Sequence, residues 1–151
     1  MFLYLDTSAI VKLVMEEPDT SAMESAIAHC RAAFSSRLAV VECARAIARV
    51  SNRNALTTAA EIFEAVVLHE VNEAVLEKAA TLTPPGLRSL DAIHLATALL
   101  LEQSNLAFVT YDEKLAWAAG GQGLSVLQPG RPFQPRRRAS PSSRGRDTIG
   151  D

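Results

Sequence analysis

Two aspartates directly follow predicted strands and could share one site. Asp6 comes straight after the apolar run Phe2–Leu5, and Asp112 comes two residues after the run Ala107–Thr110. Both runs are short and rich in strand-forming residues. If they are parallel strands of one sheet, both carboxylates point at the edge where ligands bind in open α/β sheets.

Two further carboxylates lie near predicted helix starts. Asp91 is in the first turn of a helix that Ser89 is expected to cap, and Glu42 is in the first turns of an otherwise apolar helix. Each carboxylate also has an ordinary structural explanation. Aspartate favours helix N-termini because it accepts from free N–H groups and meets the positive end of the dipole. Glu42 could pair with Arg45, three residues on, for only ~0.2–0.5 kcal/mol.

Together the four carboxylates predict a metal site. Three or four like charges at one edge of a sheet repel one another unless a cation neutralises them, and hard oxygen ligands select Mg²⁺ or Mn²⁺. Ions held in this way lower the pKa of a bound water and stabilise charge on a phosphodiester during displacement. The chemistry indicated by the pattern is hydrolysis of nucleic acid.

The elements that must position these residues alternate along the chain. Strands are predicted at 2–5, 33–35, 67–71, 107–110 and 124–127. Helices are predicted at 9–17, 20–31, 38–52, from 57 or 58 to 66, from a cap at Asn72 to 82, 89–103 and 112–119, with a break at Gly120 and Gly121. This alternation predicts an α/β fold, a three-layer α/β/α sandwich with a central parallel sheet.

Length and composition favour one globular domain that needs no disulfide bond or structural metal. The chain has 151 residues, of which 48% are hydrophobic and 21% charged, so it can bury a core without disulfides or a structural metal. Cys30 and Cys43 form no CxxC pair, which excludes a zinc site and favours reduced thiols. No export signal precedes Asp6, and the apolar stretch 92–101 is half of a membrane span. We expect a soluble, cytoplasmic protein that does not bind a membrane.

The charge is distributed unevenly along the chain. Residues 129–151 carry six arginines and two aspartates, whereas residues 1–128 carry the excess of acidic residues that brings the net charge to −2. The last segment is rich in Pro, Ser, Gly and Arg, so it cannot offset its own ordering entropy. We therefore predict a folded domain over 1–128 and a disordered basic tail over 129–151.

The four carboxylates lie in four distinct segments: Phe2–Ala9 (FLYLDTSA), the helix that carries Glu42, Leu90–Ala96 (LDAIHLA) and Val109–Leu115 (VTYDEKL). In order and spacing these segments resemble the motifs of PIN-domain ribonucleases, most closely the VapC toxins of type II toxin–antitoxin modules. The resemblance covers residues 1–128. The arginine-rich tail does not align with the family's pattern.

The resemblance implies a PIN-type sandwich and an endoribonuclease that depends on Mg²⁺, for which Mn²⁺ can substitute. It also implies an RNA substrate, inhibition by a VapB-like antitoxin, and a homodimer. The family's four acidic positions, expected to be catalytic and to hold the metal, match Asp6, Glu42, Asp91 and Asp112. The hydroxyls expected to support these carboxylates are those of Thr7 or Ser8, and of Thr110.

Other polar residues near these motifs each have a structural and a functional explanation. His94 lies one turn from Asp91, where a packed or supporting histidine is expected more often than a catalytic one. Arg45, Arg49 and Arg53 recur at helical spacing as one basic stripe, which could bind phosphates or simply face solvent. The tail arginines could attract RNA through a salt-sensitive, sequence-independent attraction, or only add solubility.

Three other functions stay open at this point. A nuclease of the same fold could act on DNA or process RNA without an antitoxin. A PIN-like module could bind without catalysis, against which the intact acidic set argues. A phosphoaspartyl phosphotransferase would also place an aspartate after the first strand, but it usually needs a second carboxylate close by in sequence, where this chain has Thr7 and Ser8.

Overall fold

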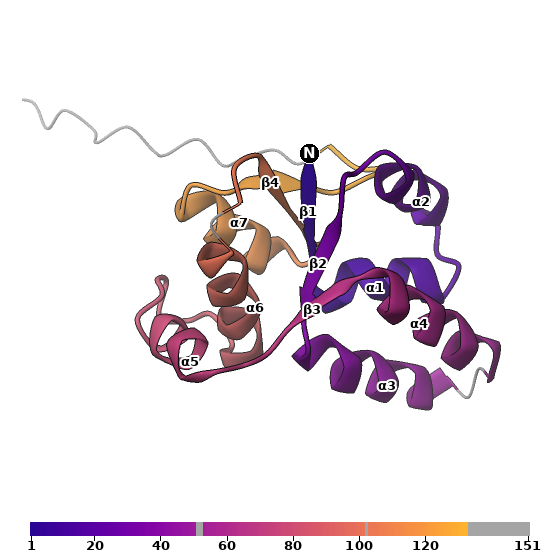
Figure 1. The fold of residues 1–151 in the computed structure, drawn as a ribbon, viewed down its shortest axis with the longest axis horizontal. Helices are drawn as coiled ribbons and strands as arrows, with labels where there is room; N and C mark the ends of the chain where they lie inside the picture. Colours follow the sequence, from indigo (N-terminus) through magenta and orange to yellow (C-terminus); the bar gives the residue numbers. More distant parts are fainter. Residues whose placement is uncertain (51–52, 102, 133–151) are drawn as a thin grey trace, which may run out of the picture.

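The chain forms one sheet between two layers of helices (Figure 1). The structure is a computed structural model, and it describes residues 1–50, 53–101 and 103–132. Within these ranges the elements, in chain order, are β1 (Phe2–Leu5), α1 (Thr7–Val14), α2 (Thr20–Ala28), β2 (Ala33–Ser36), α3 (Leu38–Val50), α4 (Arg53–Ala65), β3 (Val67–His69), α5 (Glu73–Ala80), α6 (Ser89–Leu100), β4 (Leu106–Val109), α7 (Glu113–Gly121) and β5 (Ser125–Leu127).

The order of the strands decides where a ligand can bind. The sheet runs β3-β2-β1-β4-β5, and each neighbouring pair is parallel. In the central strand, Tyr4 lies opposite Phe34 of β2 and Phe108 of β4. The chain builds outwards from β1 to β3 and then returns to the other side of β1, so the order reverses between β1 and β4. Ligands bind at the carboxyl ends of such a reversal, which here lead into Asp6 and Thr110.

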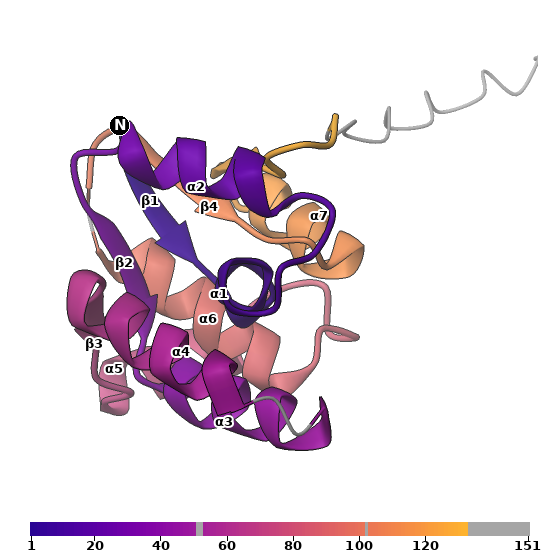
Figure 2. The same cartoon turned by 90° about the vertical axis from the view of Figure 1, so that its right-hand side faces the viewer.

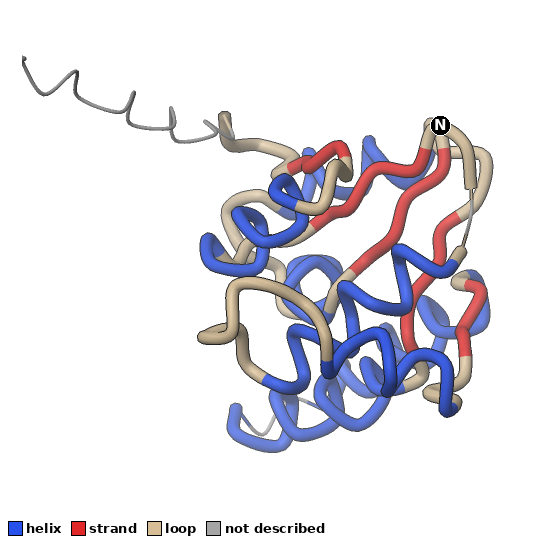
Figure 3. Tube along the Cα trace, turned by 90° about the vertical axis from the view of Figure 1, so that its left-hand side faces the viewer, coloured by secondary structure: helices blue, strands red, loops and turns tan. Residues whose placement is uncertain are grey.

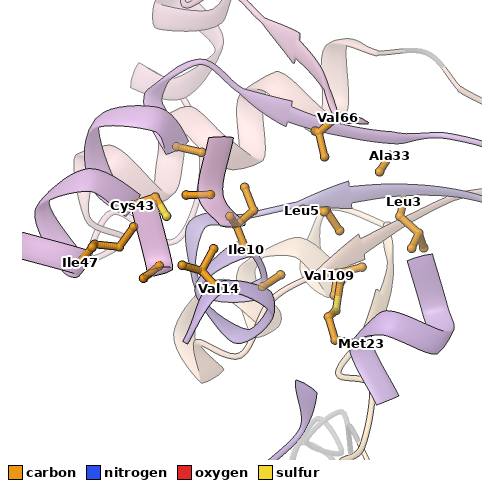
Figure 4. Packing of buried hydrophobic residues seen from close by; sticks show 14 of the residues in the cluster. Leu3, Leu5, Ile10, Val14, Met23, Ala33, Cys43, Ile47, Val66 and Val109 are labelled. Carbon is orange, nitrogen blue, oxygen red and sulfur yellow. The ribbon is translucent and has the colours of Figure 1, made fainter. Parts of the chain in front are cut away.

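The two faces of the sheet bury separate cores. Leu3 and Leu5 of β1 pack with α1 to α4, whereas Tyr4 packs with α5 to α7. Figure 2 shows the first helical layer from outside, Figure 3 shows the second, and Figure 4 shows the packing of the first core. Because both faces are covered, the strands read as continuous apolar runs. The predicted three-layer α/β/α fold with a parallel sheet is confirmed.

Two of the predicted helix starts are wrong. Helix α1 begins at Thr7 instead of Ala9, and it ends at Val14 instead of residue 17, because Glu16 adopts a left-handed φ of 46° and turns the chain. Helix α4 begins at Arg53, so the two threonines predicted to cap it, Thr57 and Thr58, lie inside it. Instead of capping the helix, the hydroxyl of Thr58 donates a hydrogen bond to the carbonyl oxygen of residue 54 (3.2 Å).

Two further predictions at helix ends are corrected. Ser89 is the first residue of α6 and does not cap it; Arg88 takes the cap position with an extended backbone (φ −64°, ψ 148°) and no side-chain cap hydrogen bond. Gly120 and Gly121 do not end the helix, because α7 includes both. The turn comes at Gly123, whose φ of 87° favours glycine. Asn72 caps α5 as predicted. The other predicted ends lie within three residues of the observed ones, and residues 51 and 52 lie outside the described part.

Residues just beyond the predicted domain boundary contact the domain. The Tyr111 hydroxyl donates to the carbonyl oxygen of Pro129 (2.7 Å), and the Arg131 Nε donates to Oδ2 of Asp19 (2.7 Å). The Arg131 guanidinium also lies 5.3 Å from the centre of the Tyr111 ring. Pro129 and Arg131, which the sequence placed in the tail, therefore contact the folded domain. The rest of the predicted tail, 133–151, lies outside the described residues.

Two simpler expectations concern the thiols and membranes. Cys30 and Cys43 are both free cysteines, and Cys43 is buried in the first core. Among the described residues, no helix combines the length and the apolar character needed to cross a bilayer.

Candidate active site

Asp6 is the N-cap of α1 and also faces the carboxyl edge of the sheet. Its Oδ1 accepts from the backbone N–H of Ala9 (2.9 Å) and from the hydroxyl of Ser8 (2.7 Å), and its Oδ2 accepts from the hydroxyl of Thr110 (2.7 Å). The side chain is almost fully buried. Burial raises the pKa of Asp6, and His94 and the hydrogen bonds oppose that shift only in part. The structural and the functional explanations of this residue are therefore compatible.

Two hydroxyls tie the end of β1 to the end of β4. Besides contacting Asp6, the Ser8 hydroxyl accepts from the backbone N–H of Tyr111 (2.8 Å), and the Thr110 hydroxyl accepts from that of Asp112 (3.1 Å). Both side chains thus hold Asp6 against the loop that leads into α7. These are the contacts that a supporting role of Ser8 and Thr110 requires.

Glu42 is held by Thr7 and by the buried pair His94 and Tyr4. Its Oε2 accepts from the hydroxyl of Thr7 (2.6 Å) and lies 2.7 Å from Nε2 of His94. His94 is 2% exposed, as expected of a packed histidine, and its Nδ1 lies 3.0 Å from the hydroxyl of Tyr4. Burial alone would raise the pKa of Glu42, but the hydrogen bonds from His94 and Thr7 outweigh it and lower the pKa. Glu42 is therefore fixed in position as an anion.

Arg88 bridges the other two carboxylates. Its Nε lies 3.2 Å from Oδ2 of Asp91, and its Nη2 lies 3.1 Å from Oδ2 of Asp112. The second oxygen of Asp112, Oδ1, caps α7 by accepting from the backbone N–H of Leu115 (2.9 Å). Burial raises the pKa of Asp91, with the nearby Arg88 opposing the shift and Asp112 adding to it. The Asp91–Asp112 pair is thus stabilised by a guanidinium in this structure.

All four carboxylates line one open pocket of about 640 Å³ at the carboxyl edge of the sheet. Thr7, Ser8 and His94 also line it, and Arg88 joins Arg45 and Arg49 of α3 around it. Thr110 lies beneath Asp6, fully buried. Arg45 and Arg49 of the predicted basic stripe thus line the same pocket as the carboxylates, whereas Arg53, predicted on the same helix, begins α4.

The donor set suits Mg²⁺, although the side chains do not yet enclose an ion. Carboxylate oxygens are what this cation prefers, and it keeps several of its waters. Within the described residues, no three Asp, Glu, His or Cys side chains converge closely enough to hold a metal ion as they stand. Arg88 occupies the space between Asp91 and Asp112. The assignment of the four carboxylates as metal ligands therefore stays a prediction.

Two contributors to the site escaped the sequence pattern. In the sequence Tyr4 looks like an ordinary apolar strand residue, and its hydrogen-bond partner His94 lies 90 positions further along the chain. Arg88 reads as a loop residue, although its position three before Asp91 is the spacing of a helical ion pair. Only that spacing could have indicated Arg88, and no local signal indicates Tyr4.

Comparison with known proteins decides the family. The sequence model of the PIN domain matches residues 3–121. The chain belongs to the PIN-domain family. Its relatives include two Mycobacterium tuberculosis proteins, Ribonuclease VapC47, 34% identical over 85% of this chain and 97% of the relative, and Ribonuclease VapC46, 38% identical over 84% and 97%. Within the PIN-domain family the chain is therefore one of the VapC ribonucleases, as the motifs predicted.

Solved structures share this PIN-domain fold. One is Mycobacterium tuberculosis VapC20, described as a sarcin-ricin loop cleaving toxin, with a TM-score of 0.66 and 16% identity over 84% of this chain and 99% of that one. Another is VapBC2 from Rickettsia felis bound to a DNA fragment from its promoter, with a TM-score of 0.63 and 13% identity over 84% and 98%. At these identities the likeness supports the fold alone.

Stability without metal should depend on pH through Asp6. A carboxyl group whose pKa is raised by folding favours the protonated folded state, so its contribution to stability falls as the pH rises from about 3.9, the ordinary value, to the raised pKa. Asp6→Asn removes this dependence. Urea unfolding in EDTA across that interval should show wild-type stability falling relative to Asp6→Asn as the pH rises. Parallel curves would contradict the burial assigned to this carboxylate.

Tyr4→Phe should weaken both the fold and the fixation of Glu42. The change leaves Nδ1 of buried His94 without its partner, which costs about 1–3 kcal/mol of unfolding free energy. Mg²⁺ should then raise the melting temperature less than in the wild type, because Glu42 is held less firmly. Tyr111→Phe is the matched control: it also removes a hydroxyl, with its hydrogen bonds to the carbonyl oxygen of Pro129 and the sulfur of Met23, but leaves Glu42 untouched. Equal Mg²⁺ responses in the two variants would refute the link from Tyr4 to Glu42.

Proposed function

We propose that the protein is a Mg²⁺-dependent endoribonuclease and the toxin of a VapBC-type toxin–antitoxin system. The observation that carries the proposal is the gathering of Asp6, Glu42, Asp91 and Asp112 around one pocket at the point where the strand order reverses. The names of the VapC relatives support RNA as the substrate. Mn²⁺ is expected to substitute for Mg²⁺, because it accepts the same oxygen ligands.

The side chains of the pocket would have different roles, metal binding or positioning, according to their surroundings. Asp6, Glu42, Asp91 and Asp112 would hold one or two ions. A bound Mg²⁺ supplies a water of lowered pKa and neutralises charge that builds up on the phosphodiester. No side chain is needed as general base, so His94 keeps a positioning role, aligning Glu42 from within the core. The hydroxyls of Ser8 and Thr110 keep Asp6 oriented towards the pocket.

We propose a VapB-like antitoxin that binds and inhibits the enzyme, a homodimer as the working form, and action in the cytoplasm. The VapC names of the relatives, and the VapBC assembly among the structures of the same fold, support the antitoxin. RNA would enter through the open side of the pocket, which the arginines of α3 border.

The function is tested first on the purified protein. Single-stranded RNA and DNA of the same sequence are incubated with the enzyme in Mg²⁺ or in EDTA. We expect cleavage of RNA in Mg²⁺ alone, with internal cuts, and its loss in Asp6→Asn. Cleavage of DNA in preference to RNA would replace the proposed substrate, and binding of RNA without any cleavage would favour a non-catalytic module.

The toxin role is tested in cells. Expression of the wild-type chain alone should slow growth of its host, whereas Asp6→Asn should not. Co-expression of a small protein encoded immediately beside it should restore growth and yield a co-purifying complex. If the wild-type chain cuts RNA but leaves growth unaffected and no neighbour binds it, the toxin role fails and a ribonuclease acting in RNA processing remains.

A further inference from the structure

Arg88 is placed where it competes with any cation that binds the pocket. One guanidinium contacts both Asp91, in the first turn of α6, and Asp112, the cap of α7. It approaches Oδ2 of each carboxylate, and the other oxygen of Asp112 is already used by the backbone. A metal ion shared by these two aspartates would therefore compete with Arg88, most directly at Oδ2 of Asp112.

The contacts of Arg88 are easy to exchange. Its side chain is 73% exposed, compared with 19% for Asp91 and 28% for Asp112. Exposed ion pairs contribute little, because water screens the attraction and ordering two side chains costs entropy. A divalent cation at the same distance attracts each carboxylate twice as strongly as a guanidinium does. Binding of Mg²⁺ would therefore displace Arg88 at a small cost in free energy. The positively charged guanidinium of Arg88 would then be free at the edge of the pocket.

We propose that Arg88 is a substrate-binding residue with two positions: it bridges Asp91 and Asp112 in the metal-free enzyme, and it binds an RNA phosphate once a divalent cation takes those carboxylates. The inference rests on the proposed ribonuclease function. A guanidinium presents a planar fork of donors that matches phosphate oxygens, so its release creates a phosphate site next to the reacting centre. Arg45 and Arg49 line the same pocket from α3 and would supply further positive charge to the RNA backbone.

This exchange predicts opposite effects of one substitution. Arg88→Ala removes the competitor, so the Mg²⁺ dissociation constant should fall by about two- to fivefold, the size of an exposed ion pair. RNA binding should weaken about tenfold, but only when a cation is present. The slope of log affinity against log salt should then become shallower by about 0.7, the value for one phosphate contact on a single strand.

The experiment measures the two affinities separately. Mg²⁺ binding is measured by calorimetry without RNA. RNA binding is measured by fluorescence anisotropy of a short labelled single-stranded RNA of mixed sequence, in EDTA and in Ca²⁺, which takes the same oxygen ligands, with RNA integrity checked on a gel. In the wild type, Ca²⁺ should raise RNA affinity. In Arg88→Ala that gain should shrink about tenfold, while affinity in EDTA stays at the wild-type level.

Two controls separate charge from structure. Arg45→Ala should lower RNA affinity equally in EDTA and in Ca²⁺ and should affect Mg²⁺ binding less than Arg88→Ala does. Arg88→Lys keeps the charge but not the fork, so it should bind Mg²⁺ nearly as the wild type does and lose part of the cation-dependent RNA affinity.

The outcomes are distinguishable from failure of the proposed function. If Arg88→Ala binds Mg²⁺ more weakly than the wild type, Arg88 is a structural clamp and the inference is wrong. If the wild type binds Mg²⁺ and cuts RNA but Arg88→Ala matches it in both affinities, the inference alone is wrong. If the wild type neither binds Mg²⁺ nor cuts RNA, the proposed function itself fails.

Discussion

An Asp91→Asn protein is expected to cleave RNA orders of magnitude more slowly than the wild type while remaining folded. The substitution keeps the shape of the side chain and removes one of the four charges that line the pocket. Burial raises the pKa of Asp91 despite its ion pair with Arg88, so folding without metal disfavours its ionised form relative to the unfolded chain. The metal-free variant should therefore be as stable as the wild type, or more stable.

Thermal melts distinguish a metal ligand from a structural carboxylate. Stabilisation by Mg²⁺ follows RT ln(1 + [L]/Kd) and should shrink in Asp91→Asn if this residue binds the ion. Asp19→Asn is the matched control, because Asp19 forms its ion pairs with Lys12 and Arg131, away from the pocket, and should keep both cleavage and Mg²⁺ stabilisation. Cleavage by Asp91→Asn at nearly the wild-type rate would remove Asp91 from the site.

The second large effect concerns the core beneath the site. Phe108 of β4 is fully buried and stacks on Tyr4, with ring centres 5.2 Å apart. Phe108→Ala should lower the unfolding free energy by about 3–5 kcal/mol, because it leaves a cavity between the sheet and the second helical layer. For a chain of this size each kcal/mol corresponds to about 2–4 °C in melting temperature.

The comparison for this prediction is an apolar side chain at the surface. Leu56 is 54% exposed, so Leu56→Ala should change the unfolding free energy by less than about 0.5 kcal/mol. Urea unfolding of the two variants measures both values. A Phe108→Ala protein as stable as Leu56→Ala would mean that the second core is not packed as described.

The sequence was sufficient for the carboxylates at strand ends because their position depends on local pattern. Asp6 and Asp112 follow apolar runs, and parallel pairing alone brings them to one edge of the sheet. Glu42 and Asp91 were less determined, since each is one polar residue near a helix start with an ordinary alternative. Their place in the pocket depends on how α3 and α6 pack against the sheet, and for these two the family resemblance added what the pattern lacked.

The errors have a common physical origin. Ser89 has a good capping side chain, but the backbone before α6 turns one residue earlier, so Arg88 takes that position. Thr57 and Thr58 are good caps too, yet α4 already starts at Arg53. In both cases tertiary packing decides where a helix begins, and local propensity yields to it. The contact of Tyr4 with His94 and the contact of Arg88 with Asp112, the cap of α7, are likewise tertiary contacts that a local pattern does not contain.

The hydrogen bond between Asp6 and Thr110 joins residues 104 positions apart in the chain. During synthesis Asp6 is therefore made long before the segment that holds it, because Thr110 and Asp112 follow β4. A chain interrupted before β4 carries Asp6, Glu42 and Asp91 without the wall that completes their pocket. We therefore expect the proposed ribonuclease activity to require a chain that has been translated through β4 and Asp112.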